Sequence, residues 1–382
     1  MNNSKHQCLI IFLAIMTTYQ NFSQNKRIRD YGIEIGVLNP GPLNAITDVE
    51  GVKVGHTTLI KDDNIRTGVT AILPNSDNIF KNKLAAAIHI GNGFGKLMGY
   101  SQVKELGTLE TPIVLTNTLS VPTAANALIS YTLDKAGNED VRSVNAVVGE
   151  TNDGYLNDIR GRHITEKHVL DAISSAESGQ VEEGNVGAGT GTRCFGYKGG
   201  IGTASRVVPE KFGGYTVGVL VQSNFGGVFQ FNGIPVAKIL NNYPNSFKYD
   251  VDGSCMMVVI TDAPLDARNL ERLAKRAMLG LARTGGIASN GSGDYVIAVS
   301  VAKQNVGNSA SDELVQKKSL LKNEAMSPLF LACIEATEEA IYNSLFTAES
   351  MSGRDGNNLE KIPIKKIIEL VKNSKNNKSI KD

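Results

Sequence analysis

The sequence predicts an α+β fold in which helices pack on the outside of a layered sheet core. Strand-like and helix-like runs follow one another without the regular alternation that marks a parallel α/β sheet. No proline- or serine-rich linker divides the 382 residues, and 41% of them are hydrophobic. A chain of this length and composition can bury one large core. We therefore expect a single unit without internal repeats.

The strands are predicted from apolar, β-branched runs that are bounded by turn residues. One such run begins at Ser254, directly after Gly253, and continues as Cys-Met-Met-Val-Val-Ile. Another ends at Pro74, which cannot donate a hydrogen bond within a sheet. We expect strands at 66–74, 83–90, 112–119, 144–149, 215–221, 254–262 and 295–302, and a short hairpin within 44–56.

The helices are predicted from caps and from apolar periodicity. Leucine and alanine recur at helical spacing between 270 and 281, and Gly285-Gly286 ends the pattern. Ser327 followed by Pro328 is typical of a helix N-terminus. We expect helices at 122–135, 165–176, 266–283 and 327–348, and a short helical turn within 235–242. The lysine- and asparagine-rich tail from Lys372 onward is expected to be disordered.

The N-terminal residues 1–23 have the pattern of a secretory signal peptide. Lys5 and His6 precede an apolar run at 8–16 that is too short to span a bilayer, and a polar stretch follows. This pattern predicts cleavage near Ser23. No small residue followed by cysteine comes after the apolar run as a lipidation site, so we expect no stable membrane anchor. The pattern predicts one domain at 24–382, located in the periplasm or secreted, with a loose lead-in at 25–31.

Charge and cysteine content exclude several classes of function. Lysine and arginine number 39 against 38 acidic residues, so no basic face for nucleic acid is expected. Cys8 belongs to the predicted signal peptide, while Cys194, Cys255 and Cys333 lie far apart and are expected to be small buried residues. The five histidines show no metal-site spacing. We expect no metal and no other cofactor.

The densest glycine region, 184–206, invites comparison with phosphate-binding loops. Gly187, Gly189 and Gly191 lack the register of a dinucleotide fingerprint, and no Gly-Lys-Ser/Thr sequence follows them. We interpret the region as close backbone packing against a site or between strands.

Ser254 is the candidate nucleophile. A serine hydroxyl needs an adjacent base. If the Gly253–Ser254 bond were broken, Ser254 would carry a free α-amino group with an ordinary pKa of about 7.7–8.0, which suits a general base near neutral pH. The same hydroxyl could break that bond by attacking the Gly253 carbonyl, and glycine tolerates the backbone strain of such an attack.

Gly253-Ser254, two segments of the glycine region and four further segments of the chain together resemble the DmpA-like family of self-processing serine aminopeptidases. This family includes L-aminopeptidase/D-Ala-esterase/amidase and the β-peptidyl aminopeptidases. The similarity extends from 44 to 348. It is carried by seven segments in order, which are 44–56, 91–95, 149–155, 186–191, 198–206, 253–254 and 290–295.

The resemblance implies a role for individual residues. Ser254 matches the nucleophile that becomes a new N-terminus after cleavage at Gly253, which would give an α chain of 24–253 and a β chain of 254–382. Asn224 matches the asparagine that helps to form the oxyanion hole.

Three further residues match polar groups of the family site. Ser292 and Asp294 match a pair beside the nucleophile that would orient the α-amine and hold the ammonium group of the substrate. Some relatives carry glutamate where this chain has Asp294. Tyr155 matches a tyrosine proposed to assist at the site.

The resemblance also implies the fold, the activity and the assembly. The expected fold is a four-layer α-β-β-α sandwich that resembles the N-terminal nucleophile hydrolases but differs in connectivity. The expected activity is that of a secreted aminopeptidase or amidase, which forms an acyl-enzyme on Ser254. Its substrates would be small peptides, amides or esters with a free N-terminal amine. We expect a homo-oligomer of αβ heterodimers.

Two other functions compete with this interpretation. An acyltransferase of the ornithine acetyltransferase type would have a related fold, but those enzymes use threonine at the cut and are cytoplasmic. Ser254 and the predicted signal peptide argue against it. A non-catalytic periplasmic binding protein whose glycine loops hold a ligand would keep an intact chain.

Overall fold

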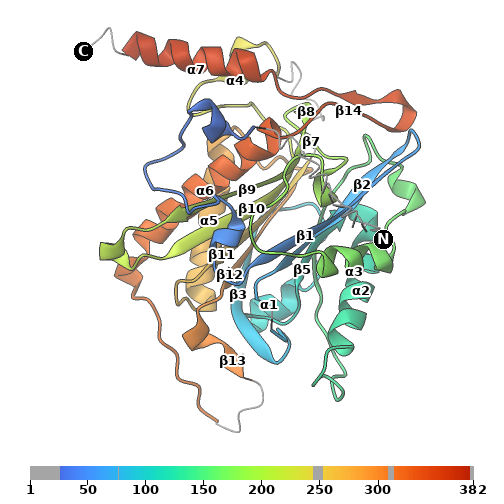
Figure 1. Ribbon diagram of the computed structural model, residues 1–382, viewed down its shortest axis with the longest axis vertical. Helices are drawn as coiled ribbons and strands as arrows, with labels where there is room; N and C mark the ends of the chain where they lie inside the picture. Colours follow the sequence, from blue (N-terminus) through green and yellow to red (C-terminus); the bar gives the residue numbers. More distant parts are fainter. Residues whose placement is uncertain (1–25, 76, 244–252, 309–313, 379–382) are drawn as a thin grey trace, which may run out of the picture.

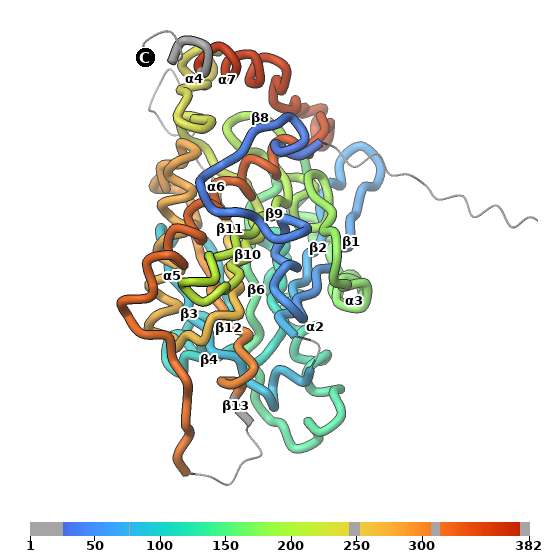
Figure 2. The backbone as a smooth tube through the Cα atoms, turned by 60° about the vertical axis from the view of Figure 1, so that its left-hand side comes forward, coloured from blue at the N-terminus to red at the C-terminus, as the bar shows by residue number. Residues whose placement is uncertain are grey.

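Two β-sheets lie face to face, and helices cover both outer faces (Figure 1). The computed structural model describes residues 26–75, 77–243, 253–308 and 314–378, with side chains as far as 374. The predicted signal peptide at 1–23 lies outside the described residues. Helices α2 (Val121–Leu133) and α3 (Glu166–Ser174) pack on the smaller sheet, and α5 (Ala267–Arg283) and α6 (Ser327–Phe346) pack on the larger one. Figure 2 shows this order of layers from the side. The predicted α-β-β-α sandwich is confirmed.

The smaller sheet has four strands in the order β1-β2-β5-β6. Its first three strands are antiparallel, whereas β5 and β6 are parallel and are connected through α2. The strands are β1 (Lys53–Lys61), β2 (Ile65–Leu73), β5 (Ile113–Asn117) and β6 (Val147–Thr151).

The larger sheet has seven strands in the order β13-β3-β12-β11-β10-β9, with β4 also paired to β3. Its central strands β11 and β12 are parallel, and α5 connects them. The strands are β3 (Asn82–Gly93), β4 (Thr108–Leu109), β9 (Gly200–Val207), β10 (Thr216–Asn224), β11 (Ser254–Thr261), β12 (Gly293–Ser300) and β13 (Gly307–Asn308).

Several short elements lie outside these layers. Two small hairpins and three helices connect or flank the sheets, and α7 runs along the top of the molecule in Figure 1. These elements are α1 (Tyr100–Leu106), α4 (Val236–Ile239), α7 (Ile364–Lys378), β7 (Arg193–Cys194), β8 (Tyr197–Lys198), β14 (Met351–Ser352) and β15 (Asn358–Leu359). None of the helices in the described residues is both long and apolar enough to cross a bilayer.

Strand β11 is buried along its whole length because both faces of its sheet are covered. Met256 and Val258 face the smaller sheet, while Cys255 and Met257 face α5 and α6. This two-sided burial explains the continuous apolar run after Ser254 in the sequence. The three described cysteines are unbonded and buried, as expected.

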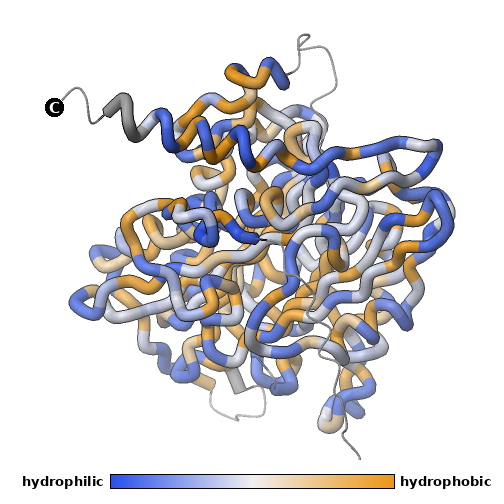
Figure 3. Tube along the Cα trace, turned by 45° about the horizontal axis from the view of Figure 1, so that its top comes forward, coloured by the Kyte–Doolittle hydropathy of each residue, from blue (hydrophilic) through white to orange (hydrophobic). Residues whose placement is uncertain are grey.

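The structure corrects two of the sequence expectations at the ends of the chain. The lead-in is not loose, because Arg27 and Arg29 form ion pairs with the buried carboxylates of Glu183 and Glu339, at 2.7 Å each. The tail does not become disordered at Lys372, because α7 continues to Lys378. Isoleucine, leucine and valine recur along one side of this helix and pack on the core, which gives it the alternating colours of Figure 3.

The glycine region contains a strand that its composition did not indicate. Residues 200–207 form β9, which pairs with β10 and lies directly under α6. A Cβ atom at Gly202 would be 2.0 Å from the Ala340 carbonyl oxygen, and one at Gly199 would be 2.4 Å from the Ser223 carbonyl oxygen. The glycines therefore allow close backbone packing, as the sequence analysis expected.

Candidate active site

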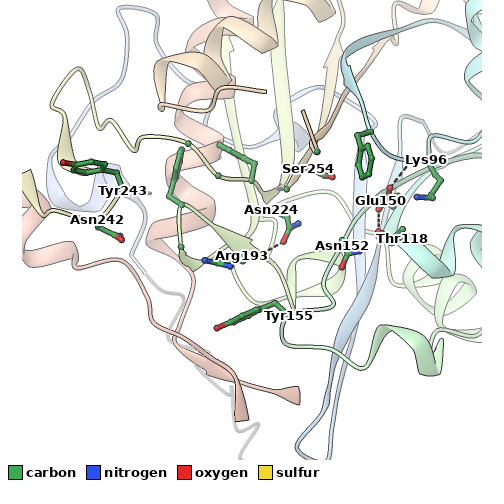
Figure 4. Close-up of a pocket in the computed structure, with 18 residues that line it drawn as sticks. Lys96, Thr118, Glu150, Asn152, Tyr155, Arg193, Asn224, Asn242, Tyr243 and Ser254 are labelled. Atoms are coloured by element: carbon green, nitrogen blue, oxygen red, sulfur yellow. Dashed lines mark hydrogen bonds between the residues drawn. The ribbon is translucent and has the colours of Figure 1, made fainter. Parts of the chain in front are cut away.

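A cavity of about 550 Å³ opens where β10 and β6 end and β11 begins. Three of the predicted site residues, Ser254, Asn224 and Tyr155, line it together with Gly253 (Figure 4). Ser292 and Asp294 do not line it. The fold thus brings the candidate nucleophile and the candidate oxyanion donor into one cavity.

Ser254 and Asn224 are direct partners across the antiparallel pair β10–β11. Opposite residues in such a pair have neighbouring side chains on the same face of the sheet. The Asn224 Oδ1 atom accepts a hydrogen bond of 2.8 Å from the backbone N–H group of Arg193. Because Oδ1 is the acceptor of the amide, Nδ2 carries the two donors that remain for a ligand. Asn224 is therefore oriented as a hydrogen-bond donor beside Ser254.

The Gly253–Ser254 peptide is tightly packed. The Gly293 N–H group donates to the Gly253 carbonyl oxygen and to Ser254 Oγ, at 3.2 Å each. A Cβ atom at position 253 would be 2.4 Å from the Asn224 carbonyl oxygen. Only glycine fits directly before Ser254 without a backbone shift, and its carbonyl oxygen already has a donor in place.

Asp294 lies on the opposite face of the large sheet from Ser254. Its neighbours on that face, Val296 and Cys255, pack towards α5 and α6. Burial raises the pKa of Asp294 to about 6, and the nearby Ser292 hydroxyl and Cys255 N–H only partly oppose this effect. Among the described residues, neither carboxylate oxygen of Asp294 nor Ser292 Oγ has a well-formed hydrogen bond. The pair is buried and incompletely satisfied beneath the start of β11.

Replacing Asp294 with asparagine is expected to stabilise the folded protein at alkaline pH. The folded-state pKa of about 6 exceeds the ordinary 3.8, so the folded state holds this proton more tightly. Burying the charged carboxylate therefore does not lower the free energy of unfolding below about pH 4. Above about pH 6 it lowers the free energy of unfolding by its full amount, about 3 kcal/mol. In a Ser254→Ala background, which lacks the hydroxyl of the candidate nucleophile, urea unfolding should show Asp294→Asn more stable by about that amount at pH 8. The advantage should vanish at pH 4. An equal difference at both pH values would contradict this account.

Glu150 is the carboxylate that does line the cavity, and sequence reasoning assigned it no role. It is buried at the end of β6. One carboxylate oxygen accepts a 2.9 Å hydrogen bond from the backbone N–H of Lys96, and the other accepts a hydrogen bond from the Thr118 hydroxyl. Burial raises its pKa above the ordinary value, and these two hydrogen bonds oppose the shift. The signal in the sequence was its position, because it comes directly after the predicted strand 144–149 and within the matching segment 149–155.

Arg193, Lys96 and Phe94 also line the cavity and were not singled out from the sequence. Lys96 and Arg193 are exposed, and the Arg193 guanidinium lies 5.1 Å from the centre of the Tyr155 ring. Their neighbours in sequence are glycines, threonines and loop residues, so no periodic pattern marked them. The segment that follows β3 and the β7–β8 hairpin, which are far apart in the sequence, bring them together.

Comparison with known proteins places this geometry in a family. The model of peptidase family S58 matches residues 44–359. The chain is 39% identical over 368 residues to a β-peptidyl aminopeptidase of Sphingosinicella microcystinivorans, covering 89% of this chain and 90% of the relative. It is 37% identical to a β-peptidyl aminopeptidase of Sphingosinicella xenopeptidilytica, covering 91% of each.

Solved structures are similar over the same extent. A protein of Pyrococcus horikoshii is 48% identical with a TM-score of 0.85, covering 91% of this chain and 99% of its own. A Burkholderia β-aminopeptidase is 40% identical with the same TM-score and coverage. The L-aminopeptidase D-Ala-esterase/amidase of Ochrobactrum anthropi, described as a prototype serine aminopeptidase with a variant N-terminal nucleophile hydrolase fold, is 36% identical with a TM-score of 0.82, covering 89% and 96%. The chain therefore belongs to peptidase family S58 and is a hydrolase of the serine aminopeptidase type.

Proposed function

We propose that the chain cuts itself before Ser254 and then releases N-terminal amino acids from small peptides, amides or esters. The observation that carries this proposal is the cross-strand pair of Ser254 and Asn224, in a cavity that also holds the buried carboxylate of Glu150. The names of the relatives add peptides that begin with a β-amino acid to the candidate substrates.

The proposed cleavage needs only groups of this chain and one water molecule. Ser254 Oγ attacks the Gly253 carbonyl carbon, the peptide C–N bond breaks, and Gly253 is left as an ester on the hydroxyl while the Ser254 nitrogen becomes an amine. Water then hydrolyses the ester and leaves Gly253 with a free carboxylate. The Gly293 N–H, 3.2 Å from the Gly253 carbonyl oxygen, is positioned to stabilise the negative charge that develops there. The products are the chains 24–253 and 254–382.

The mature enzyme would use the same hydroxyl with the new amine as its base. The amine takes the proton of Ser254 Oγ as the oxygen attacks the substrate carbonyl, and Asn224 Nδ2 donates to the oxyanion. The departing amine takes the proton, and water hydrolyses the acyl-enzyme. We assign Ser292 and Asp294, beneath the start of β11, to orienting the freed α-amine. Tyr155 would contact the substrate from the cavity wall.

We assign the ammonium group of the substrate to Glu150, whereas the family resemblance implies Asp294 for this role. Glu150 lines the cavity and Asp294 does not. A buried carboxylate that already accepts two hydrogen bonds is held in place to pair with a cation. This pairing would restrict hydrolysis to chain ends.

The location and the assembly are further parts of the proposal. The signal-like pattern at 1–23 supports export to the periplasm or beyond, with removal of the signal. The resemblance to the DmpA-like family supports a homo-oligomer of αβ pairs.

The test of the proposed function is the state of the purified protein. A denaturing gel should show two bands, and N-terminal sequencing of the smaller should read Ser-Cys-Met-Met. The same preparation should hydrolyse aminoacyl p-nitroanilides from a panel of α- and β-amino acids. An active preparation in which every chain is intact would overturn the mechanism, because the Ser254 nitrogen would still be an amide.

A further inference from the structure

The charged side chains of the cavity lie on opposite sides of Ser254. Figure 4 shows Glu150, Thr118 and Lys96 on one side of Ser254 and Asn224, and Arg193 and Tyr155 on the other. Glu150 is the one carboxylate among the described residues that line the cavity. Among the described lining residues, one side of the cavity therefore carries the carboxylate of Glu150 together with the cation of Lys96, and the other, here called the cationic side, carries Arg193 as its charged side chain.

Arg193 is held in position by two contacts. Its backbone N–H group donates to Asn224 Oδ1 at 2.8 Å, which fixes the backbone of the β7–β8 hairpin beside the candidate oxyanion donor. Its guanidinium lies over the Tyr155 ring, 5.1 Å from the ring centre, in a cation–π contact.

The guanidinium of Arg193 has no carboxylate partner in the described part of the chain. It forms neither an ion pair nor a side-chain hydrogen bond there, and its side chain is exposed at the cavity. A planar guanidinium with all its donors available matches the geometry of a carboxylate, to which it can donate two parallel hydrogen bonds. The cationic side of the cavity is therefore suited to a carboxylate ligand.

The direction of the substrate follows from the proposed function, on which this inference rests. The scissile carbonyl would lie between Ser254 and Asn224, with the ammonium group directed to Glu150. The leaving group then extends to the other side, where Arg193 and Tyr155 lie. One residue of extended chain spans about 3.5 Å. The backbone N–H of Arg193 contacts the Asn224 side chain, so the side chain of Arg193 starts next to the candidate oxyanion donor. A leaving group as short as one or two residues can therefore end near the Arg193 guanidinium.

We propose that Arg193 binds the C-terminal carboxylate of the substrate, and that the enzyme prefers short zwitterionic peptides of two or three residues over the corresponding amides. Glu150 and Arg193 would thus recognise the two charged ends of one small peptide. Tyr155 acts as a positioning residue that holds the guanidinium at the cavity wall.

The test compares a dipeptide with its C-terminal amide, using the N-terminal residue that the p-nitroanilide panel shows to be hydrolysed best. The wild-type protein should have a kcat/KM about 10-fold to 100-fold higher for the free acid, as expected for a charge-assisted hydrogen-bonded pair. Arg193→Met should bring this ratio to within about twofold of one, and Arg193→Lys should give an intermediate ratio because a lysine is only a point charge. Both substrates are measured on the same protein, so any general loss of activity cancels in the ratio.

Lys96→Met is the matched control. Lys96 is the other exposed cation that lines the cavity, but it lies on the Glu150 side. Its replacement should leave the acid-to-amide ratio at the wild-type value. A wild-type ratio near one, a ratio that survives Arg193→Met, or an equal loss in Lys96→Met would each overturn the inference. These outcomes are distinct from failure of the proposed function, in which the chain stays uncut and no p-nitroanilide is hydrolysed.

Discussion

Replacing Ser254 with alanine is expected to leave the chain in one piece and to lower kcat/KM for aminoacyl p-nitroanilides by about 10⁶-fold, the loss that follows removal of the nucleophile in other serine hydrolases. Ser254 would supply both the attacking oxygen and the nitrogen that serves as its base, so one substitution removes the hydroxyl and keeps the nitrogen in an amide. A denaturing gel and a p-nitroanilide assay measure the two effects. A Ser254→Ala protein that is cut at the same bond, or that keeps more than about 1% of the activity, would contradict the mechanism.

The two roles of the hydroxyl can be separated by cutting the chain with a second enzyme. A specific protease site that ends directly before residue 254 would expose an N-terminal alanine in the Ser254→Ala protein and an N-terminal serine in the wild type. Cleavage alone should not restore activity to the alanine protein. Activity in that protein would show that the hydroxyl is needed only for processing.

A conservative replacement controls for misfolding. Ser254 is buried at the start of β11, so a cysteine there changes the packing little and keeps a strong nucleophile. Ser254→Cys should still be cut. An uncut Ser254→Cys protein that unfolds cooperatively like the wild type would indicate that the position is structural rather than nucleophilic.

The parts of this fold that were predictable are those in which local pattern and burial agree. Helix α5 shows its buried face as leucine and alanine at helical spacing, and β11 shows its two-sided burial as a continuous apolar run. Strand β9 was missed because its glycines are required by the close approach of α6, a contact between residues more than a hundred positions apart. The helix α7 was missed because its apolar residues pack on a distant core, and the surrounding lysines and asparagines dominated the composition.

The roles of the candidate site residues stay predictions, but the structure shows which of these residues lie together. Gly253 before Ser254 suggested a candidate nucleophile, and the family resemblance added Asn224, Tyr155, Ser292 and Asp294 as candidates, of which Asn224 and Tyr155 line the same cavity as Ser254. The sequence could not show that Ser254 and Asp294 lie on opposite faces of the sheet. That separation depends on the parallel register of β11 and β12, in which Ser254 pairs with Gly293 and Asp294 pairs with Cys255.

Replacing Glu150 with glutamine is expected to lower kcat/KM for aminoacyl p-nitroanilides by about 10²–10³-fold. The substitution keeps the size of the side chain and removes the charge that would pair with the substrate ammonium in a buried site. Loss of one partner from such a pair costs about 2–5 kcal/mol. Self-cleavage involves no substrate ammonium, so the variant should still appear as two bands on a denaturing gel. That result would show that the fold and the nucleophile are intact.

The dependence of activity on pH separates a binding role of Glu150 from a structural one. Burial raises the pKa of Glu150, so its carboxylate takes up a proton as the pH falls through a range above the ordinary one for glutamate. Protonation removes the charge, and kcat/KM of the wild-type protein should therefore decline on the acid side with a KM that rises. Glu150→Gln has no such proton to gain and should lack this acid limb while keeping the limb set by the Ser254 amine.

N-acetylated substrates, which have no ammonium group, should be equally poor for both proteins. If Glu150→Gln discriminates against acetylated substrates as strongly as the wild type does, the ammonium group is bound elsewhere.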